Sequence, residues 1–343
     1  MSSLSGTRRG ARPPHSNEIL GRRAILAPAM RLALIRFTAL ARASAVLFCG
    51  AATAPGLASA VDPSALPDIG PDTSLLIISP HPDDETLCCG GVIQRVVHAG
   101  GRVTLVWLTS GDAARVNLIL IGQTLFPGTA VARELGARRM GEAGLAAARL
   151  GVARSGQVFL GYPDGGLQEL LATHRTTPYT SPTTGATAVP YAAALYPGHA
   201  YTGESLERDL GAVLERVQPT LILAPTPLDS HPDHRAAGVL TQLLAGRLAR
   251  PPAVRYWIVH GGEGWPSPRD LLLGVPLTPA PRAASLAPAG FELAPAEEDV
   301  KLLALRAYQT QMRVMAPFLL SFVRTNELFS MRADLDARLA QAR

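Results

Sequence analysis

Two apolar runs of strand length constrain the fold of this chain most strongly, because each leads into a polar segment that contains histidine. Residues 74–79 (Ser-Leu-Leu-Ile-Ile-Ser) precede Pro80-His81-Pro82-Asp83-Asp84-Glu85, and residues 221–224 (Leu-Ile-Leu-Ala) lie shortly before His231-Pro232-Asp233-His234. A continuous apolar run is typical of a strand that is buried on both faces of a parallel sheet. Open α/β sheets gather their reactive groups at the carboxyl ends of such strands. We therefore expect the two polar segments to meet at one edge of a sheet.

Further strand and helix signals alternate along the chain. Gly100-Gly101 ends the first predicted helix, and the strand after it completes a unit with a right-handed crossover. These signals predict an α/β fold class: a Rossmann-like, mostly parallel sheet with helices on both faces and a metal site at the C-terminal strand edge. Strands are expected at residues 102–109, 157–160 and 255–260, and helices at residues 92–99, 130–150, 204–217, 234–248 and 297–315, with 319–328 as a candidate further helix.

The length of the chain favours one large domain behind an N-terminal segment. A chain of 343 residues can bury a sizeable core without dividing into several domains. We expect an export segment at residues 1–60, a linker at residues 61–73 and a single catalytic domain at residues 74–343. Three stretches of that domain are expected as loop insertions, at residues 113–129, 173–202 and 265–295.

The positive charge of the chain belongs to its N-terminus. The formal net charge is +5, but residues 1–60 hold eight arginines against the single acid Glu18, so the rest of the chain carries −2. This distribution argues against a nucleic-acid partner. The arginines precede an apolar stretch from Ala43 to Ala54 and the small-residue site Ala58-Ser59-Ala60, a pattern typical of a bacterial export signal.

We therefore expect a periplasmic or secreted protein that is cleaved after Ala60, with Met30 as an alternative start. A cytoplasmic protein or one with an N-terminal anchor is the alternative. No stretch after residue 60 reaches the roughly 20 apolar residues of a membrane span, so no stable span is expected after cleavage. Cys88 and Cys89 are adjacent, and we expect them to pack as small apolar side chains without bonding each other.

The first polar segment carries residues that suit a metal ion. His81 and Asp84 are three positions apart, so they can face one point across a turn, and His234 can complete a set of two histidines and one carboxylate. Zinc suits this set, although Fe²⁺ or another divalent ion could also be held. Such an ion activates water for hydrolysis. Asp83 would serve as the general base, and His231 would stabilise the oxyanion or protonate the leaving group.

Simpler interpretations of these residues also exist. The first segment could be a turn in which an aspartate caps the following helix. Glu85 could orient a metal ligand, or it could be a solvated acid in the first helical turn. Two histidine segments at matching strand ends favour the metal site over a simple turn.

The two segments also resemble a known family. Residues 80–91 (Pro-His-Pro-Asp-Asp-Glu-Thr-Leu-Cys-Cys-Gly-Gly) and 231–238 (His-Pro-Asp-His-Arg-Ala-Ala-Gly) are similar to the two signature motifs of the PIG-L/LmbE family, which contains zinc-dependent de-N-acetylases. The resemblance runs from about Ser74 to Gly246. It implies zinc ligands at His81, Asp84 and His234, a catalytic base at Asp83, an assisting histidine at His231, and substrate contacts at Arg139 and Asp164.

The sequence thus predicts a zinc-dependent enzyme that removes an N-acetyl group from an N-acetylglucosamine-type sugar or glycoconjugate. Another zinc amidase or esterase on the same scaffold, a non-catalytic carbohydrate-binding protein and an Fe²⁺ oxygenase are the alternatives. One position departs from the family pattern. Some members that process sugars have a tyrosine two residues before the first histidine of the second motif, where this chain has Asp229.

Overall fold

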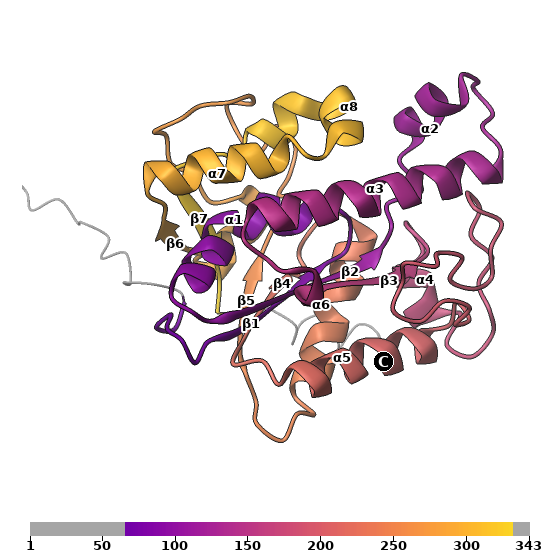
Figure 1. Cartoon of the computed structure of the whole chain (residues 1–343), viewed down its shortest axis with the longest axis horizontal. Helices are drawn as coiled ribbons and strands as arrows, with labels where there is room; N and C mark the ends of the chain where they lie inside the picture. Colours follow the sequence, from indigo (N-terminus) through magenta and orange to yellow (C-terminus); the bar gives the residue numbers. More distant parts are fainter. Residues whose placement is uncertain (1–65, 332–343) are drawn as a thin grey trace, which may run out of the picture. The chain divides into compact units, whose positions relative to one another are not determined.

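A five-stranded parallel sheet organises the part of the chain that the computed structural model describes, residues 66–331 (Figure 1). Its strands are β1 (Ser74–Ser79), β2 (Arg102–Thr109), β3 (Gln157–Tyr162), β4 (Leu221–Pro225) and β5 (Ala253–Trp257). Every pair of neighbouring strands is parallel, which confirms the predicted fold class. The predicted export segment lies outside the described residues, so the division of the chain before residue 66 stays a prediction.

The strand order β3-β2-β1-β4-β5 brings the two polar segments together. From β1 the chain moves outward through β2 and β3, and it then returns to place β4 on the other side of β1. The direction of winding therefore reverses between β1 and β4. Ligands of open α/β sheets bind in the crevice at the carboxyl ends of the strands at such a switch point. The histidine segments follow these two strands.

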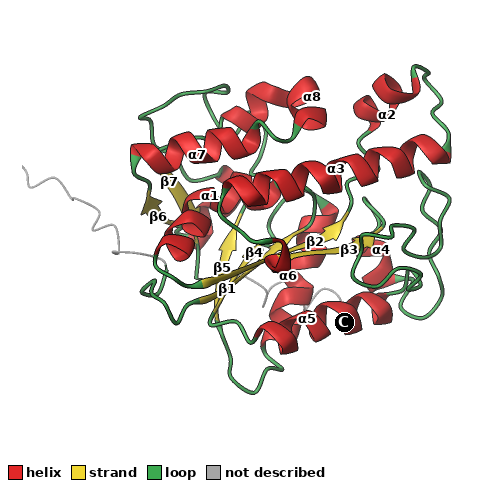
Figure 2. Ribbon diagram, in the orientation of Figure 1, coloured by secondary structure: helices red, strands yellow, loops and turns green. Residues whose placement is uncertain are grey.

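Helices cover both faces of the sheet (Figure 2). The helices α1 (Asp84–His98), α3 (Thr129–Arg149) and α7 (Pro295–Leu305) lie on one face, and α4 (Leu167–Ala172), α5 (Gly203–Val217) and α6 (Pro232–Ala245) lie on the other. The strands between these two layers are almost wholly apolar, and all six residues of β1 are buried. Double-sided burial explains why β1 has no alternation of polar and apolar residues.

The insertions and the C-terminal region hold more regular structure than the sequence indicated. Residues 113–129 contain the helix α2 (Arg115–Gly122), because Leu118 packs against Ala132 and Leu135 of α3. Residues 265–295 contain the 3₁₀ helix η2 (Pro281–Leu286) and the strand β6 (Ala289–Glu292), which pairs with β7 (Asn326–Phe329).

Three of the expected helices differ from those in the structure. The helix expected at residues 297–315 is broken at residues 306–308, so that α8 (Gln309–Leu320) is separate from α7. The candidate helix 319–328 is wrong, since it covers the end of α8 and the start of β7. The first helix begins at Asp84 and not at residue 92, and the histidine segment therefore forms its first turn.

A buried carboxylate ties the C-terminal elements to α1. The two carboxylate oxygens of Glu327, in β7, accept hydrogen bonds from the backbone nitrogens of Gly91 (2.8 Å) and Val92 (3.1 Å). Lys301 of α7 donates to the same carboxylate at 2.7 Å, and both side chains are almost completely buried. These contacts fix α7 and β7 against α1. The helix α8, which lies between α7 and β7 in the sequence, can then line the crevice.

The expectation for the two adjacent cysteines is wrong on one point. Cys88 and Cys89 are joined by a disulfide within the first half of α1. Both side chains nevertheless belong to the apolar core, as expected. Among residues 66–331, the helices are all too short or too polar to cross a membrane.

Candidate metal centre

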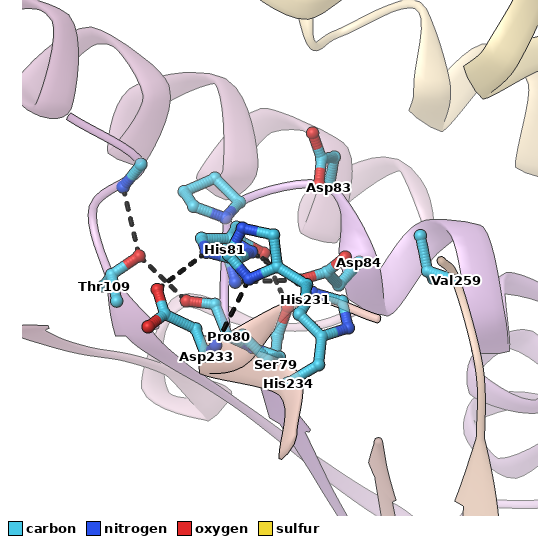
Figure 3. Close-up of polar contacts among 12 residues, drawn as sticks. Ser79, Pro80, His81, Asp83, Asp84, Thr109, His231, Asp233, His234 and Val259 are labelled. Atoms are coloured by element: carbon cyan, nitrogen blue, oxygen red, sulfur yellow. Dashed lines mark hydrogen bonds and ion pairs between the residues drawn. The ribbon is translucent and has the colours of Figure 1, made fainter. Parts of the chain in front are cut away.

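The two histidine segments form turns that lie side by side at the carboxyl ends of β1 and β4. The first segment connects β1 to α1, and the second supplies the start of α6. Figure 3 shows His81, Asp84 and His234 converging on one point from the two turns. The predicted ligands therefore come together although about 150 residues separate the two segments.

The three side chains place their donor atoms in a small triangle. His81 Nδ1 lies 3.3 Å from Asp84 Oδ2, which lies 3.2 Å from His234 Nε2. The two nitrogens are 3.2 Å apart. A tetrahedral zinc ion with ligands at about 2.0–2.1 Å requires donor atoms about 3.3 Å from one another. The triangle therefore matches one face of a zinc coordination shell, and these residues could hold a metal ion.

Carboxylates behind the two histidines determine which ring nitrogens face that point. His81 Nε2 lies 3.1 Å from Asp233 Oδ2 and 3.2 Å from Asp164 Oδ1. His234 Nδ1 lies 3.1 Å from Asp229 Oδ2. A histidine that ligates a metal usually donates its other N–H to such a partner. This pairing would leave His81 Nδ1 and His234 Nε2 free to bind a metal ion.

Asp229 and Asp233 are site residues that the sequence reasoning missed. Asp229 is completely buried, and its Oδ2 also accepts hydrogen bonds from the backbone nitrogens of Val259 (3.1 Å) and His260 (3.0 Å). Asp233 accepts hydrogen bonds from Gly165 N (2.7 Å) and Leu167 N (3.0 Å). Both lie in or next to the second motif, so a search for carboxylates within a few residues of His234 would have found them.

Asp83 stands apart from the triangle. It is the residue before α1, has a φ of 124°, and makes no side-chain capping hydrogen bond, so the simple helix-cap interpretation does not account for it. A residue with a side chain in such a conformation stores roughly 1–3 kcal/mol of strain. Its carboxylate points away from the two metal-facing histidines (Figure 3). Burial raises the pKa of Asp83 to about 7, although the charge of Arg139 opposes the shift.

Arg139 holds this turn in place from α3. Its guanidinium donates to Pro82 O (2.7 Å), Gly111 O (2.8 Å) and Asp83 Oδ2 (3.2 Å). Gly111 has a φ of +69°, and a Cβ at that position would collide with the guanidinium. The Nε of Arg139 has no hydrogen-bond partner among the described residues. The predicted substrate contact thus lies beside the predicted base and on the wall of the same cavity.

Glu85 is buried and not solvated, so one of its two interpretations is wrong. Its carboxylate accepts hydrogen bonds from Trp107 Nε1 (2.8 Å), Thr86 Oγ1 (2.6 Å) and Tyr308 Oη. It also accepts from the backbone nitrogen of Asp83 at 3.3 Å. Glu85 therefore supports the backbone of the turn that carries Asp83, and it links this turn to β2 and to the residue before α8.

His231 is the first residue of the second motif and precedes α6. Its Nδ1 accepts a hydrogen bond from Asp233 N at 3.2 Å, so the neutral ring carries its proton on Nε2. Burial, assisted by His81 and His234, lowers the pKa of His231 to about 2. The ring centre lies 4.6 Å from that of His81. His231 is therefore a neutral hydrogen-bond donor beside the triangle.

The residues surround a cavity of about 190 Å³. Its wall includes Asp83, Asp84, His81, Arg139, Asp164 and His231, so it brings together all the predicted site residues except His234, which is completely buried. His260, after β5, also lines it and was not anticipated. The ring of His260 lies 5.2 Å from that of His231, and burial lowers its pKa to about 4. A larger groove of about 1090 Å³ lies between α3 and residues 190–193, away from these side chains.

Comparisons with known proteins identify the family of this chain. A family model described as "PIG-L: GlcNAc-PI de-N-acetylase" matches residues 76–244, which include both motifs. A protein of Nakamurella multipartita named 1D-myo-inositol 2-acetamido-2-deoxy-alpha-D-glucopyranoside deacetylase is 30% identical over 240 residues, 67% of this chain and 69% of the relative. The chain belongs to the PIG-L family.

Other relatives and solved structures are similar to this PIG-L protein over most of its length. The protein of the same name from Mycobacteroides abscessus is 29% identical over 258 residues, 70% of this chain and 82% of the relative. The N,N'-diacetylchitobiose deacetylase of Pyrococcus horikoshii is 20% identical, with a TM-score of 0.47 over 77% of this chain and 85% of that one. The A40926 pseudoaglycone deacetylase Dbv21 is 22% identical, with a TM-score of 0.46 over 70% and 83%.

Proposed function

We propose that this PIG-L protein is a metal-dependent hydrolase that removes the N-acetyl group from an N-acetylglucosamine-type sugar or glycoconjugate. The observation that carries the proposal is the triangle of three donor atoms with a separate, buried carboxylate beside it. Binding a metal ion and accepting a proton are different tasks, and the structure offers a separate aspartate for each, Asp84 for the first and Asp83 for the second. The relatives named as deacetylases support the choice of an N-acetyl group.

His81 Nδ1, Asp84 Oδ2 and His234 Nε2 would hold the metal ion, which we propose to be zinc. When bound, such an ion polarises the amide carbonyl and lowers the pKa of water at the site. Two nitrogens and one oxygen can also bind Fe²⁺ or another divalent ion. The buried carboxylates behind the histidines would stabilise the positive charge of any of these ions.

Asp83 would take the proton from the attacking water. Arg139 and the strained backbone fix the direction of this carboxylate, which is buried beside the cavity. The neutral His231 would donate its Nε2 proton in a hydrogen bond to the carbonyl oxygen as negative charge develops there. The proton that Asp83 has accepted would then pass to the departing amine, which leaves acetate and a free amino sugar.

Arg139 and Asp164 would contact the sugar. Both side chains line the cavity, and the unpartnered Nε of Arg139 is a free donor among the described residues. Both also have structural partners, since Arg139 binds the first turn and Asp164 accepts a hydrogen bond from Ala113 N at 2.9 Å. Their substitution is therefore expected to change the position of the substrate and of Asp83 together.

Acetate release from a panel of N-acetylglucosaminides, with and without a chelator, tests the proposal. We expect release that the chelator abolishes and that added zinc restores. Faster cleavage of simple esters or of other amides would favour the alternative amidase or esterase. Binding of the sugars without acetate release would favour a carbohydrate-binding protein.

Substitution of the adjacent aspartates separates their roles. Asp83→Asn should retain the metal while kcat falls by on the order of 10²–10⁴, the usual contribution of a general base. Asp84→Asn is the matched variant, and it should lose metal affinity and regain activity partly at high zinc concentration. Metal content by elemental analysis and kcat measure the two effects. Turnover near the wild-type value in Asp83→Asn would mean that the base lies elsewhere.

A further inference from the structure

Large apolar side chains are exposed around α2 and the connection that follows it. The exposed fractions are 58% for Val116, 39% for Leu120, 68% for Leu125 and 87% for Phe126. Single exposed apolar residues are common on soluble proteins, but a local concentration marks an interaction site. Four of the ten exposed large apolar side chains of residues 66–331 lie in this stretch of eleven residues, so it is such a concentration.

These four side chains do not contribute to the core of the domain. The helix α2 is held on its inner side by Leu118, which packs against Ala132 and Leu135 of α3 in a small cluster separate from the main core. Asn117 donates to Gln311 of α8 at 2.5 Å. Figure 1 shows α2 and the loop after it at the edge of the described fold, away from the sheet. Val116, Leu125 and Phe126, the most exposed of the four, are therefore available for a partner.

The surface beside α2 is basic. A groove of about 510 Å³ between α2, α3 and α8 is lined by Leu120 and by Arg138 and Arg313, both of which are exposed. The acid in this groove, Glu142, is occupied by the backbone nitrogen (3.0 Å) and Oγ1 (2.6 Å) of Thr310. Arg138 also lies 3.4 Å from Glu134, but both side chains are more than half exposed, so this surface ion pair is weak. No acidic residue lies between Asp112 and Glu134 in the sequence. Leu120 therefore shares a groove with Arg138 and Arg313, and Val116, Leu125 and Phe126 belong to the same short stretch of chain as Leu120.

We propose that this surface, formed by Val116, Leu120, Leu125, Phe126, Arg138 and Arg313 and here termed the α2 surface, docks on an anionic lipid bilayer. Apolar side chains that enter the headgroup region, with basic side chains beside them, are typical of peripheral membrane binding. The four apolar side chains together offer roughly a few hundred Å². A stable protein interface needs about 800 Å² from each partner, so a second copy of the chain fits this surface less well.

The α2 surface also adjoins the cavity of the candidate metal centre. Ala113 and Ala114, directly before α2, line that cavity, and Gln311 lines it from α8. Docking would therefore bring the cavity close to the headgroups of the bilayer. The docking itself requires neither a metal ion nor turnover, so it can be tested independently of the proposed deacetylation.

Co-sedimentation of the full chain with vesicles tests the docking. We expect binding to vesicles that contain phosphatidylglycerol, weaker binding to pure phosphatidylcholine, and a decrease with rising salt. The double variant Leu125→Ser/Phe126→Ser should reduce the partition coefficient at least about tenfold. Leu273→Ser is the matched control, because Leu273 is 53% exposed and lies in another part of the chain. The variants and the wild type have the same residues 1–65 and 332–343, so a difference in vesicle binding between them reports on the α2 surface.

The basic part of the surface is tested in the same way. Arg138→Gln/Arg313→Gln should weaken binding to phosphatidylglycerol several-fold and leave binding to phosphatidylcholine unchanged. Arg216→Gln, on α5 at the opposite face of the sheet, is the control for a change of charge. Inorganic phosphate at millimolar concentration should not displace the vesicles. Displacement by phosphate would show a simple anion site and would overturn docking on a bilayer.

A tryptophan at the tip of the surface gives a direct readout. All three native tryptophans, Trp107, Trp257 and Trp265, are buried, so Phe126→Trp introduces an exposed reporter. Its emission should shift to the blue with phosphatidylglycerol vesicles, whereas that of Leu273→Trp should not. Wild-type binding by the double serine variant would overturn the proposal. So would a dimer in analytical ultracentrifugation that the serine variant abolishes without any binding of vesicles.

Discussion

At the scale of single residues, Asp229 contacts His234 of the candidate metal centre from the side opposite the triangle of donor atoms. Its carboxylate holds His234 Nδ1 at 3.1 Å and two backbone nitrogens after β5. Burial opposes the negative charge, but His234 and the hydrogen bonds keep the pKa of Asp229 well below its ordinary value. A charged carboxylate in this position raises the basicity of the histidine that it orients.

We expect Asp229→Asn to lower the affinity for zinc about 10–100-fold, because the amide orients His234 without a negative charge. Competitive titration with a chelating dye measures the change. Asp209→Asn is the matched control, since Asp209 is equally buried and binds His199 Nδ1 at 2.8 Å away from the metal centre. Equal zinc affinities of Asp229→Asn and the wild type would contradict this role.

Asp112 is a second buried carboxylate, and its burial affects how the free energy of unfolding depends on pH. Its Oδ2 accepts hydrogen bonds from Ser110 Oγ (2.9 Å) and Tyr191 Oη (2.6 Å), whereas its Oδ1 has no partner among the described residues. Burial, together with the charge of Asp164, raises the pKa of Asp112 from 3.8 to about 6. The folded protein therefore binds more protons than the unfolded chain between about pH 4 and pH 6, and the free energy of unfolding falls as the pH rises through that range.

We expect Asp112→Asn to be more stable than the wild type by about 2–3 kcal/mol at pH 7.5, and by much less at pH 4.5. The amide oxygen can still accept from Ser110 and Tyr191, and the buried charge beside Asp164 is gone. Urea unfolding of both proteins at the two pH values measures the difference. A difference of the same size at both values would show that folding does not raise the pKa of Asp112.

At the scale of helices and strands, the amino-acid sequence predicted the elements that lie in the core of the domain. The strand β1 is a continuous apolar run because it is buried on both faces, and the adjacent β4 has the same pattern for the same reason. The pairing of β6 with β7 joins residues about 35 positions apart, and only the folded chain brings these two short segments together. The six-residue helix α4 begins where Asp233 binds Gly165 N and Leu167 N, so a distant side chain defines its start.

The residues of the candidate site divide in the same way, into those that the sequence predicted and those that only the folded chain brings together. His81, Asp84 and His234 could be proposed from their spacing, because each follows an element that the apolar pattern predicts. His260 could not, because it acquires its place from the pairing of β5 with β4 and from the hydrogen bond of its backbone to Asp229. The surroundings of Arg139 depend likewise on the packing of α3 against the turn at Gly111. The sequence thus indicated the three candidate ligands, and tertiary contacts determined which side chains lie behind them.

At the scale of the whole molecule, the distribution of charge separates two parts of the chain. Residues 1–60 carry +7 and the remaining residues −2, so the basic character of the α2 surface is local and is not a property of the whole catalytic part. An arginine-rich segment before an apolar stretch and a small-residue site is typical of export. We propose that residues 1–60 direct export, and that the protein acts in the periplasm or outside the cell.

Cleavage after Ala60 is the expected outcome in a bacterial host that secretes proteins. Mass spectrometry of the periplasmic or secreted fraction should find a new N-terminus near Val61, and a protein that starts there should retain full acetate release, because the site residues lie between His81 and His260. Ala60→Phe should block cleavage, since a bulky residue replaces the small one at the cleavage site. Ala52→Phe, within the apolar stretch that precedes this site, is the control and should be cleaved as in the wild type. Recovery of the intact N-terminus from the cytosol would overturn the export of this protein while leaving its proposed chemistry untouched.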